Sequence, residues 1–315
     1  MSKRIVFLDY ARAFALFLVV FAHLYSIDSK VKLYVYAFHM PFFFLISGYL
    51  RKDTETIKLL KKLTNRLLIP FCFFLFIGYC YFVISSKSLA INTAYASLTG
   101  IIFGKAIAAN DILWFLLALF HVRIIGNTFI RNSLYIRVPL VALYFILCLS
   151  HNNTLYLGTS MMALPFYLVG YYAKKKINIL IGSNYCLLIS LACFVCTIII
   201  TNINGKVSMM GMSFGKTSYV WLNMLLFYLN GIFGSIMLMC LSGLFRKESY
   251  IVRIVSKCSI SIVGLQFIPI IIWMNTIGFN QSYSISILYS IMIIVFSVLF
   301  HLLVEKKANW LLGGK

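Results

Sequence analysis

The sequence predicts an all-α fold, a polytopic integral membrane helical bundle with about ten transmembrane helices and both termini in the cytoplasm. Of the 315 residues, 62% are hydrophobic and 11% are charged, against about a quarter charged in soluble domains. The mean hydropathy is +0.95. Apolar runs of about 20 residues, long enough to cross a bilayer, recur along the chain. This composition argues against a soluble globular enzyme and against a disordered chain.

The candidate spans follow from these apolar runs. Ten runs qualify, at roughly 5–25, 33–50, 67–85, 112–130, 134–150, 160–173, 178–201, 219–245, 253–274 and 283–304. The stretch 89–107 is mildly apolar and rich in Ala and Gly, so it is an alternative re-entrant or interfacial segment. The first run follows a basic start like a signal peptide, but Asp9 and Arg12 interrupt it, which favours a retained helix. We expect one membrane domain over residues 1–315.

The basic residues indicate the topology. The chain has 28 Lys and Arg against 7 Asp and Glu, an excess that would suggest nucleic acid in a soluble protein. With an internal N-terminus and ten spans, 20 basic residues fall on the cytoplasmic side and six fall outside, at Lys30, Lys32, Lys87, Lys105, Lys206 and Lys216. This split follows the positive-inside rule. It predicts a lipid bilayer as a partner and no nucleic acid.

The eight cysteines nearly all fall in apolar runs, where small buried packing residues are expected. We predict no metal site and no structural disulfide.

The first helix carries three ionisable residues, although such residues are rare inside a bilayer and usually functional there. Arg12 and His23 are 11 residues apart, so they share one helical face about 16 Å apart along the axis. Asp9 lies three residues before Arg12 and can pair with it. The alternative is a structural Asp9–Arg12 pair and an interfacial His23. A structural role does not require all three residues on one face.

The second helix and its neighbours add further candidates. His39 is expected at the depth of His23, and Ser47 precedes Gly48, where small side chains allow close helix contact or a slender ligand. Lys58, Lys62 and Arg66 recur at every fourth position and form either an ordinary membrane anchor or a phosphate clamp.

The fourth helix opens with Asp111 and Trp114, one turn apart at the expected outer surface. An acid beside an aromatic ring suits sugar hydroxyls, whereas a lone Trp is typical of an interfacial anchor. His121, Arg123 and His301 receive no role beyond hydrogen bonding within the bundle.

Several blocks, taken in order, resemble the membrane-bound acyltransferase 3 family, which includes polysaccharide O-acetyltransferases and fucose 4-O-acetylase-like proteins. They are LDYARAFALFLVVFAH, in which Arg12 and His23 match a basic residue–ten residues–His pattern, FHMPFFFLISGYL, the basic run before RLLIPF, LWFLLALF, and Glu305 in LLVEKK. Many members have an R-x-x-R pair before the third helix. Here Leu63 stands at the first position, directly after Lys62.

The resemblance implies an O-acyltransferase in a bacterial cytoplasmic (inner) membrane. It would move an acetyl group from cytoplasmic acetyl-CoA, a co-substrate rather than a bound cofactor, to a hydroxyl of a surface polysaccharide such as O-antigen or of its lipid-linked sugar precursor. His23 would be the general base, since histidine titrates near neutral pH. Arg12, held by Asp9, would orient the donor.

The same resemblance distributes the other candidates between the two substrates. Lys58, Lys62, Arg66 and Ser47 would join Arg12 in binding CoA, whereas His39, Asp111 and Trp114 would shape the acceptor end.

Two other functions remain as alternatives. A transporter or flippase for a lipid-linked sugar also fits ten helices and intramembrane charges, but the sequence lacks the inverted repeats and paired broken helices typical of transporters. A structural membrane partner would not need the ionisable stripe of the first helix. The acceptor sugar, its hydroxyl position, the acyl group and the oligomeric state stay open.

Overall fold

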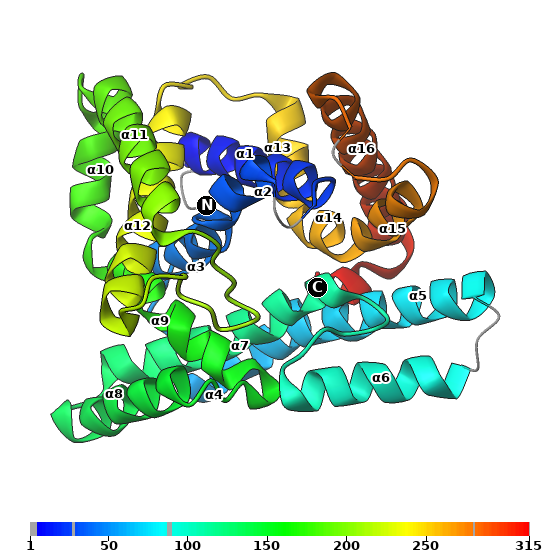
Figure 1. The fold of residues 1–315 in the computed structure, drawn as a ribbon, viewed down its shortest axis with the longest axis horizontal. Coiled ribbons are helices and arrows are strands. Elements are labelled where there is room, and N and C mark those ends of the chain that lie inside the picture. The colour runs from blue at the N-terminus through cyan, green and yellow to red at the C-terminus, as the bar shows by residue number, and fades with distance from the viewer. Residues whose placement is uncertain (1–4, 27–28, 87–89, 280, 315) are drawn as a thin grey trace.

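The structure is a computed structural model and describes residues 5–26, 29–86, 90–279 and 281–314. These residues form helices and, in the segment before α12, one isolated β-bridge between Ser208 and Ser213. Four basic residues of the topology analysis, Lys3, Arg4, Lys87 and Lys315, lie outside the described residues. Figure 1 shows the arrangement of the helices.

The first half of the chain contains α1 (Val6–His23), α2 (Lys30–Tyr36), α3 (His39–Tyr49), α4 (Thr56–Leu63), the π-helical turn η1 (Thr64–Leu68), α5 (Ile69–Ser86), α6 (Ala90–Phe103), η2 (Asp111–Leu113), α7 (Trp114–Arg131) and α8 (Leu134–Leu149). The second half contains η3 (Thr154–Tyr156), α9 (Leu157–Tyr172), α10 (Lys174–Gly182), α11 (Cys186–Asn204), α12 (Val220–Gly243), α13 (Tyr250–Lys257), α14 (Ser259–Leu265), α15 (Phe267–Thr276), α16 (Tyr283–Ala308) and η4 (Asn309–Leu312).

Eight helical stretches of the described chain are long and apolar enough to cross a membrane. They are Val6–His23, Lys30–Tyr49, Thr56–Ser85, Asp111–Arg131, Cys186–Asn204, Val220–Gly243, Ser259–Thr276 and Tyr283–Leu312. The other two expected spans form α8 and α9, each of 16 residues. At 1.5 Å per residue, each is about 24 Å long, a few ångströms shorter than a typical hydrocarbon core. The prediction of an all-α polytopic bundle is confirmed.

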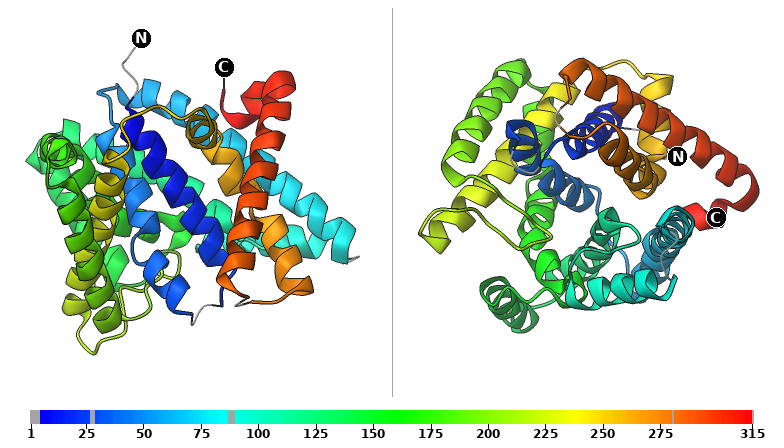
Figure 2. Two further views of the ribbon diagram at one scale, coloured as in Figure 1. Left: turned by 90° about the horizontal axis from the view of Figure 1, so that it is seen from above. Right: turned by 45° about the vertical axis from the view of Figure 1, so that its right-hand side comes forward.

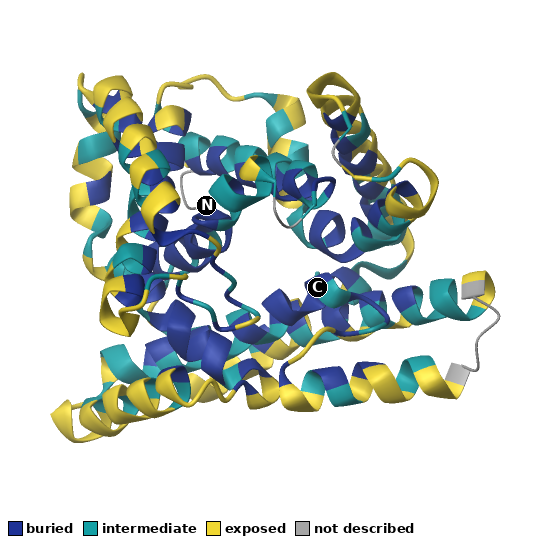
Figure 3. Cartoon of the chain, in the orientation of Figure 1, coloured by how far each residue is buried: buried dark blue, intermediate teal, exposed yellow. Residues whose placement is uncertain are grey.

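The outside of the bundle is apolar. Large apolar side chains are exposed on the peripheral helices, among them Tyr135 of α8 (90% exposed), Leu188 of α11 (64%) and Leu303 of α16 (65%). Figure 3 shows these helices with many exposed residues and α3 largely buried. Exposed apolar surface of this extent marks a membrane or protein interface, which agrees with a membrane-embedded bundle.

α3 and α9 approach each other closely because both carry a glycine at their contact. A Cβ on Gly48 would lie 1.9 Å from the carbonyl oxygen of Tyr167, and one on Gly170 would lie 1.9 Å from the carbonyl oxygen of Leu45. Only hydrogen fits at these two positions. This contact fixes Ser47 and Tyr167 relative to each other, and both line the cavity described below.

α1 connects the two ends of the bundle. It begins on the same side as η4, as the left view of Figure 2 shows, and crosses to the opposite side, where it ends at His23. We name the side where α1 begins the basic end and the side where it ends the histidine end.

Candidate active site

A cavity of about 620 Å³ opens at the basic end. Seven basic side chains line it, whereas no Asp or Glu of the described chain does. They are Arg12, Arg51, Lys52, Lys62, Arg66, Arg123 and Lys257. The remaining wall is largely apolar and includes Leu16, Phe43, Ile46, Phe115 and Leu116. The cavity therefore joins a strongly cationic surface to an apolar interior.

Three of the predicted donor-site residues besides Arg12 line this cavity, and one does not. Ser47, Lys62 and Arg66 line it. Lys58 does not; its side chain is 74% exposed and pairs with Glu55 at 2.9 Å. Lys58 lies near the exposed beginning of α4, so the cavity includes only the last two residues of the expected stripe.

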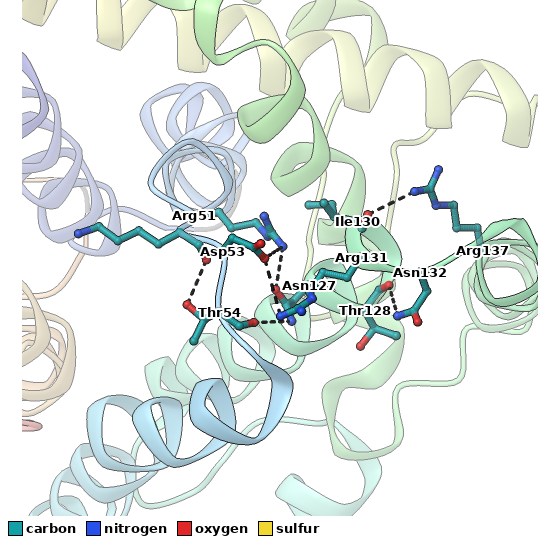
Figure 4. A network of polar contacts seen from close by, with 10 residues as sticks. Arg51, Asp53, Thr54, Asn127, Thr128, Ile130, Arg131, Asn132 and Arg137 are labelled. Carbon is teal, nitrogen blue, oxygen red and sulfur yellow. Dashed lines mark hydrogen bonds and ion pairs between the residues drawn. The ribbon is translucent and has the colours of Figure 1, made fainter.

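Arg51, which was not among the predicted site residues, is a cavity cation held by several contacts. Its side chain is 6% exposed. Its Nη2 donates to Asn127 Oδ1 at 2.9 Å and lies 3.3 Å from Asp53 Oδ1, while the guanidinium lies 5.0 Å from the ring centre of Tyr171. Figure 4 shows Arg51 pointing toward Asn127 and Asp53 between two helices. Its buried Nε has no hydrogen-bond partner among the residues that the structure describes.

Two carboxylates act on the cavity from behind its wall. Glu305, the family-like glutamate of α16, pairs with Lys257 Nζ at 2.6 Å. Asp9 accepts a hydrogen bond from Ser256 Oγ at 2.7 Å. Lys257 and Ser256 both line the cavity, whereas the two carboxylates do not. Glu305 and Asp9 therefore position groups of α13 at the cavity wall.

At the histidine end, Tyr36 connects the two predicted histidines. Its hydroxyl lies 3.1 Å from His23 Nδ1, and its ring centre lies 4.8 Å from that of His39. His39 is 4% exposed, and its Nδ1 contacts the carbonyl oxygen of Val35 at 2.9 Å. The structure thus brings His23 and His39 together, as their predicted depths require, through a tyrosine that the sequence analysis did not select.

The two acceptor-site candidates of the fourth span lie in one turn where η2 joins α7. Asp111 Oδ1 accepts the backbone N–H of Ile107 at 3.3 Å. Trp114 is buried, with 8% exposed, and its ring centre lies 6.5 Å from that of Tyr156. Burial of this kind does not suit an interfacial anchor, so Trp114 belongs to the core around the site.

The cavity and the histidine cluster share α1 but do not merge. Leu16 lines the cavity, whereas His23 does not. The two residues are seven positions apart, which is about 10 Å of helix axis. A group bound at the basic end therefore needs a long, slender extension to reach His23.

Position in the sequence gave a signal for two functional residues that were not among the predicted site residues. Arg51 directly follows the FHMPFFFLISGYL block, and Tyr36 precedes His39 by three positions. Nothing in the sequence indicated Asn127, because its pairing with Arg51 joins α7 to the segment after α3. Among the described residues, no group of three or more His, Cys, Asp or Glu side chains is placed to hold a metal ion.

Comparison with known proteins decides the family. Residues 5–305 match the model of the acyltransferase 3 family, described as an acyltransferase domain. The chain belongs to the acyltransferase 3 family. The match spans α1 to Glu305 and so includes the cavity and the histidine cluster. No curated protein and no solved structure matches the chain. The helical bundle of this acyltransferase is consistent with a multi-pass membrane protein.

Proposed function

We propose that this acyltransferase moves an acetyl group from acetyl-CoA to a hydroxyl of a cell-surface polysaccharide or its lipid-linked sugar precursor. One observation carries the proposal: among the described residues, seven basic side chains and no carboxylate line the cavity, and α1, which contributes to its wall, ends at the cluster of His23, Tyr36 and His39. The cationic part of the cavity suits phosphate groups, and its apolar wall suits a long, slender arm. A hydroxyl acceptor fits the cluster.

The donor occupies the cavity at the basic end. Arginine and lysine both bind phosphate, and arginine does so with a planar fork of donors. Arg51, Lys62 and Arg66 hold the CoA phosphates, and Lys257, fixed by Glu305, joins them. Arg12 orients the pantetheine arm, which passes Ser47 and Leu16 toward His23. Lys58, which does not line the cavity, is left out of this donor site.

The reaction is an acyl transfer with His23 as general base. His23 removes the proton from the acceptor hydroxyl as the oxygen attacks the thioester carbonyl carbon. A new C–O bond forms and the C–S bond breaks. The proton held by His23 then passes to the CoA thiolate, which leaves as the thiol. Tyr36 orients the imidazole through its hydroxyl, while His39, Asp111 and Trp114 surround the acceptor.

The proposal includes a direction across the membrane. The basic end faces the bacterial cytoplasm, where acetyl-CoA is made, and the histidine end faces the outer side of the cytoplasmic membrane. This orientation places most Lys and Arg residues inside, as the positive-inside rule requires.

The test is an assay with the purified protein in liposomes, [14C]acetyl-CoA and de-O-acetylated surface polysaccharide from cells that carry the protein. We expect labelled acetyl groups on the glycan, and we expect free CoA to be released in an amount equal to the acetyl groups transferred. Mass spectrometry of the glycan then gives the position of each added acetyl group. Movement of glycan across the membrane without labelling would contradict the proposal and support the transporter alternative.

A further inference from the structure

A group of lysines at the histidine end is not explained by membrane topology. α2 carries Lys30 and Lys32, and the segment between α11 and α12 carries Lys206 and Lys216. The two segments are joined because Tyr34 of α2 donates to Asn202 of α11 at 3.0 Å, and the backbone N–H of Lys216 donates to Asn204 at 3.0 Å. The positive-inside rule predicts few basic residues on the outer side, so their gathering there calls for another cause.

Two of these lysines line one recess next to the proposed general base. Lys32 and Lys206 line one recess together with Tyr36 and Ser208. The Lys32 Nζ lies 5.2 Å from the ring centre of Tyr36 and donates to the carbonyl oxygen of Tyr25 at 3.3 Å. Tyr36 in turn contacts His23 at 3.1 Å. One side chain therefore separates the recess from His23.

The charges around the recess are unbalanced. Lys32 interacts electrostatically with Lys206, which repels it, and with Asp111, which attracts it. None of the ion pairs recorded for the described residues includes Lys32 or Lys206. Lys32 is partly buried and Lys206 is exposed, and two ammonium groups that line one recess repel each other. An anion placed between them relieves this repulsion.

The size of the recess limits what enters it. Its volume is about 30 Å³, which is room for about two groups of water size, such as the two oxygens of a carboxylate, rather than for a sugar ring. A carboxylate substituent fits, whereas the ring that bears it must remain outside, on the side of Tyr36 and His23.

We propose that the acceptor is an acidic sugar, whose carboxylate enters the recess between Lys32 and Lys206 while a hydroxyl of the same residue lies at His23. This inference rests on the proposed acetyl transfer and narrows its acceptor to a uronic acid or another sugar acid. Lys32 and Lys206 are specificity-determining residues that bind the substituent, and His23 acts on the hydroxyl.

The experiment compares two forms of one polysaccharide in the liposome assay with acetyl-CoA. One is the de-O-acetylated surface polysaccharide of cells that carry the protein, and the other is the same material after reduction of its carboxylates to alcohols. We expect transfer to the original hydroxyl to fall about tenfold or more, the scale of a charge-assisted hydrogen bond. Two-dimensional NMR locates the acetyl group, so that acetylation of the new alcohol is not counted.

Variants identify the residues responsible. Lys32→Gln and Lys206→Gln should each raise KM for the acidic glycan with little change in kcat or in KM for acetyl-CoA, and Lys32→Arg should restore much of the binding. Lys30→Gln is the matched control, because Lys30 is on the same helix but does not line the recess. Loss of activity by the two variants toward both glycan forms alike would indicate a structural role and overturn the inference.

The outcomes separate the two proposals. Equal transfer to both glycan forms, or an accepted glycan without any acidic sugar, overturns the inference and leaves the acetyltransferase proposal intact. If neither form accepts an acetyl group, the proposed function fails and the inference fails with it.

Discussion

The cavity contains both buried and exposed cationic side chains. The side chain of Arg51 is 6% exposed and is held by Asn127, Asp53 and Tyr171. Lys52 and Arg66 are exposed at the same cavity. A buried, oriented guanidinium loses little conformational entropy when it binds an anion, whereas a solvated side chain must first be ordered. Arg51 should therefore contribute more to donor binding than its exposed neighbours.

Arg51→Gln should raise KM for acetyl-CoA about tenfold or more, which is the loss expected for one charge-assisted hydrogen bond. The matched control is Arg131→Gln, because Arg131 contacts the same Asp53 at 3.8 Å but does not line the cavity. The measurement is initial rate against acetyl-CoA concentration with saturating glycan. Equal KM values for the two variants would contradict a donor-binding role for Arg51.

His23→Ala should lower kcat about a hundredfold or more, because general base catalysis contributes factors of this size. KM for acetyl-CoA should change little, since His23 does not line the donor cavity. Steady-state kinetics of acetyl transfer checks both values, and the melting temperature in detergent checks that the variant is folded. Transfer at the wild-type rate would remove His23 from the mechanism.

At the scale of helices, the glycine contacts between α3 and α9 hold the site together. α3 carries His39 toward the histidine end and Ser47 at the cavity, while α9 carries Tyr167 at the cavity. The backbones meet where Gly48 lies against Tyr167 and Gly170 against Leu45. A side chain at either glycine must push the helices apart, so that both parts of the site change together.

Gly48→Ala should destabilise the folded protein by about 3 kcal/mol, at the upper end of overpacking effects, because the obstructing atom is backbone. Gly182→Ala is the control, since a Cβ there meets nothing within 4 Å. Thermal unfolding in detergent, followed by circular dichroism, measures both variants. A Gly48→Ala protein with the same melting temperature as the control would contradict this prediction, because it would show that α3 and α9 can separate without loss of stability.

The whole molecule is a bundle with two chemically different ends joined by α1. The basic end carries the large cationic cavity, and the histidine end carries His23, Tyr36 and His39. About 10 Å of α1 between Leu16 and His23 separates them. This arrangement suits a reaction in which donor and acceptor approach from opposite sides of a membrane.

The proposed orientation predicts that the two ends are accessible from opposite sides of the cytoplasmic membrane. Lys175→Cys at the basic end should react with an impermeant maleimide only after permeabilisation of spheroplasts, whereas Lys105→Cys at the histidine end should react without it; both lysines are exposed. Labelling of the wild-type protein gives the background from its own cysteines. Reaction of both variants from the same side would contradict the proposed orientation.

Much of the fold was predictable because hydropathy is a local property of the chain. Every polar backbone group in a bilayer core must be paired within the protein, so long apolar runs there become helices. Eight of the ten expected spans have the length and composition to cross, and α8 and α9 are shorter. The exposed beginning of α4, which leaves Lys58 outside the cavity that Lys62 and Arg66 line, left no trace in the hydropathy pattern.

The sequence by itself determined the all-helical membrane class, the family-like blocks and the alignment of Arg12 with His23, because each depends on composition or on spacing within one helix. Only the tertiary structure decided which cations share a cavity, that Arg51 is buried against Asn127, and that Tyr36 joins the two histidines. These contacts join helices that are distant in the chain or separated by a break in helical geometry. Periodicity within one helix carries no information about them.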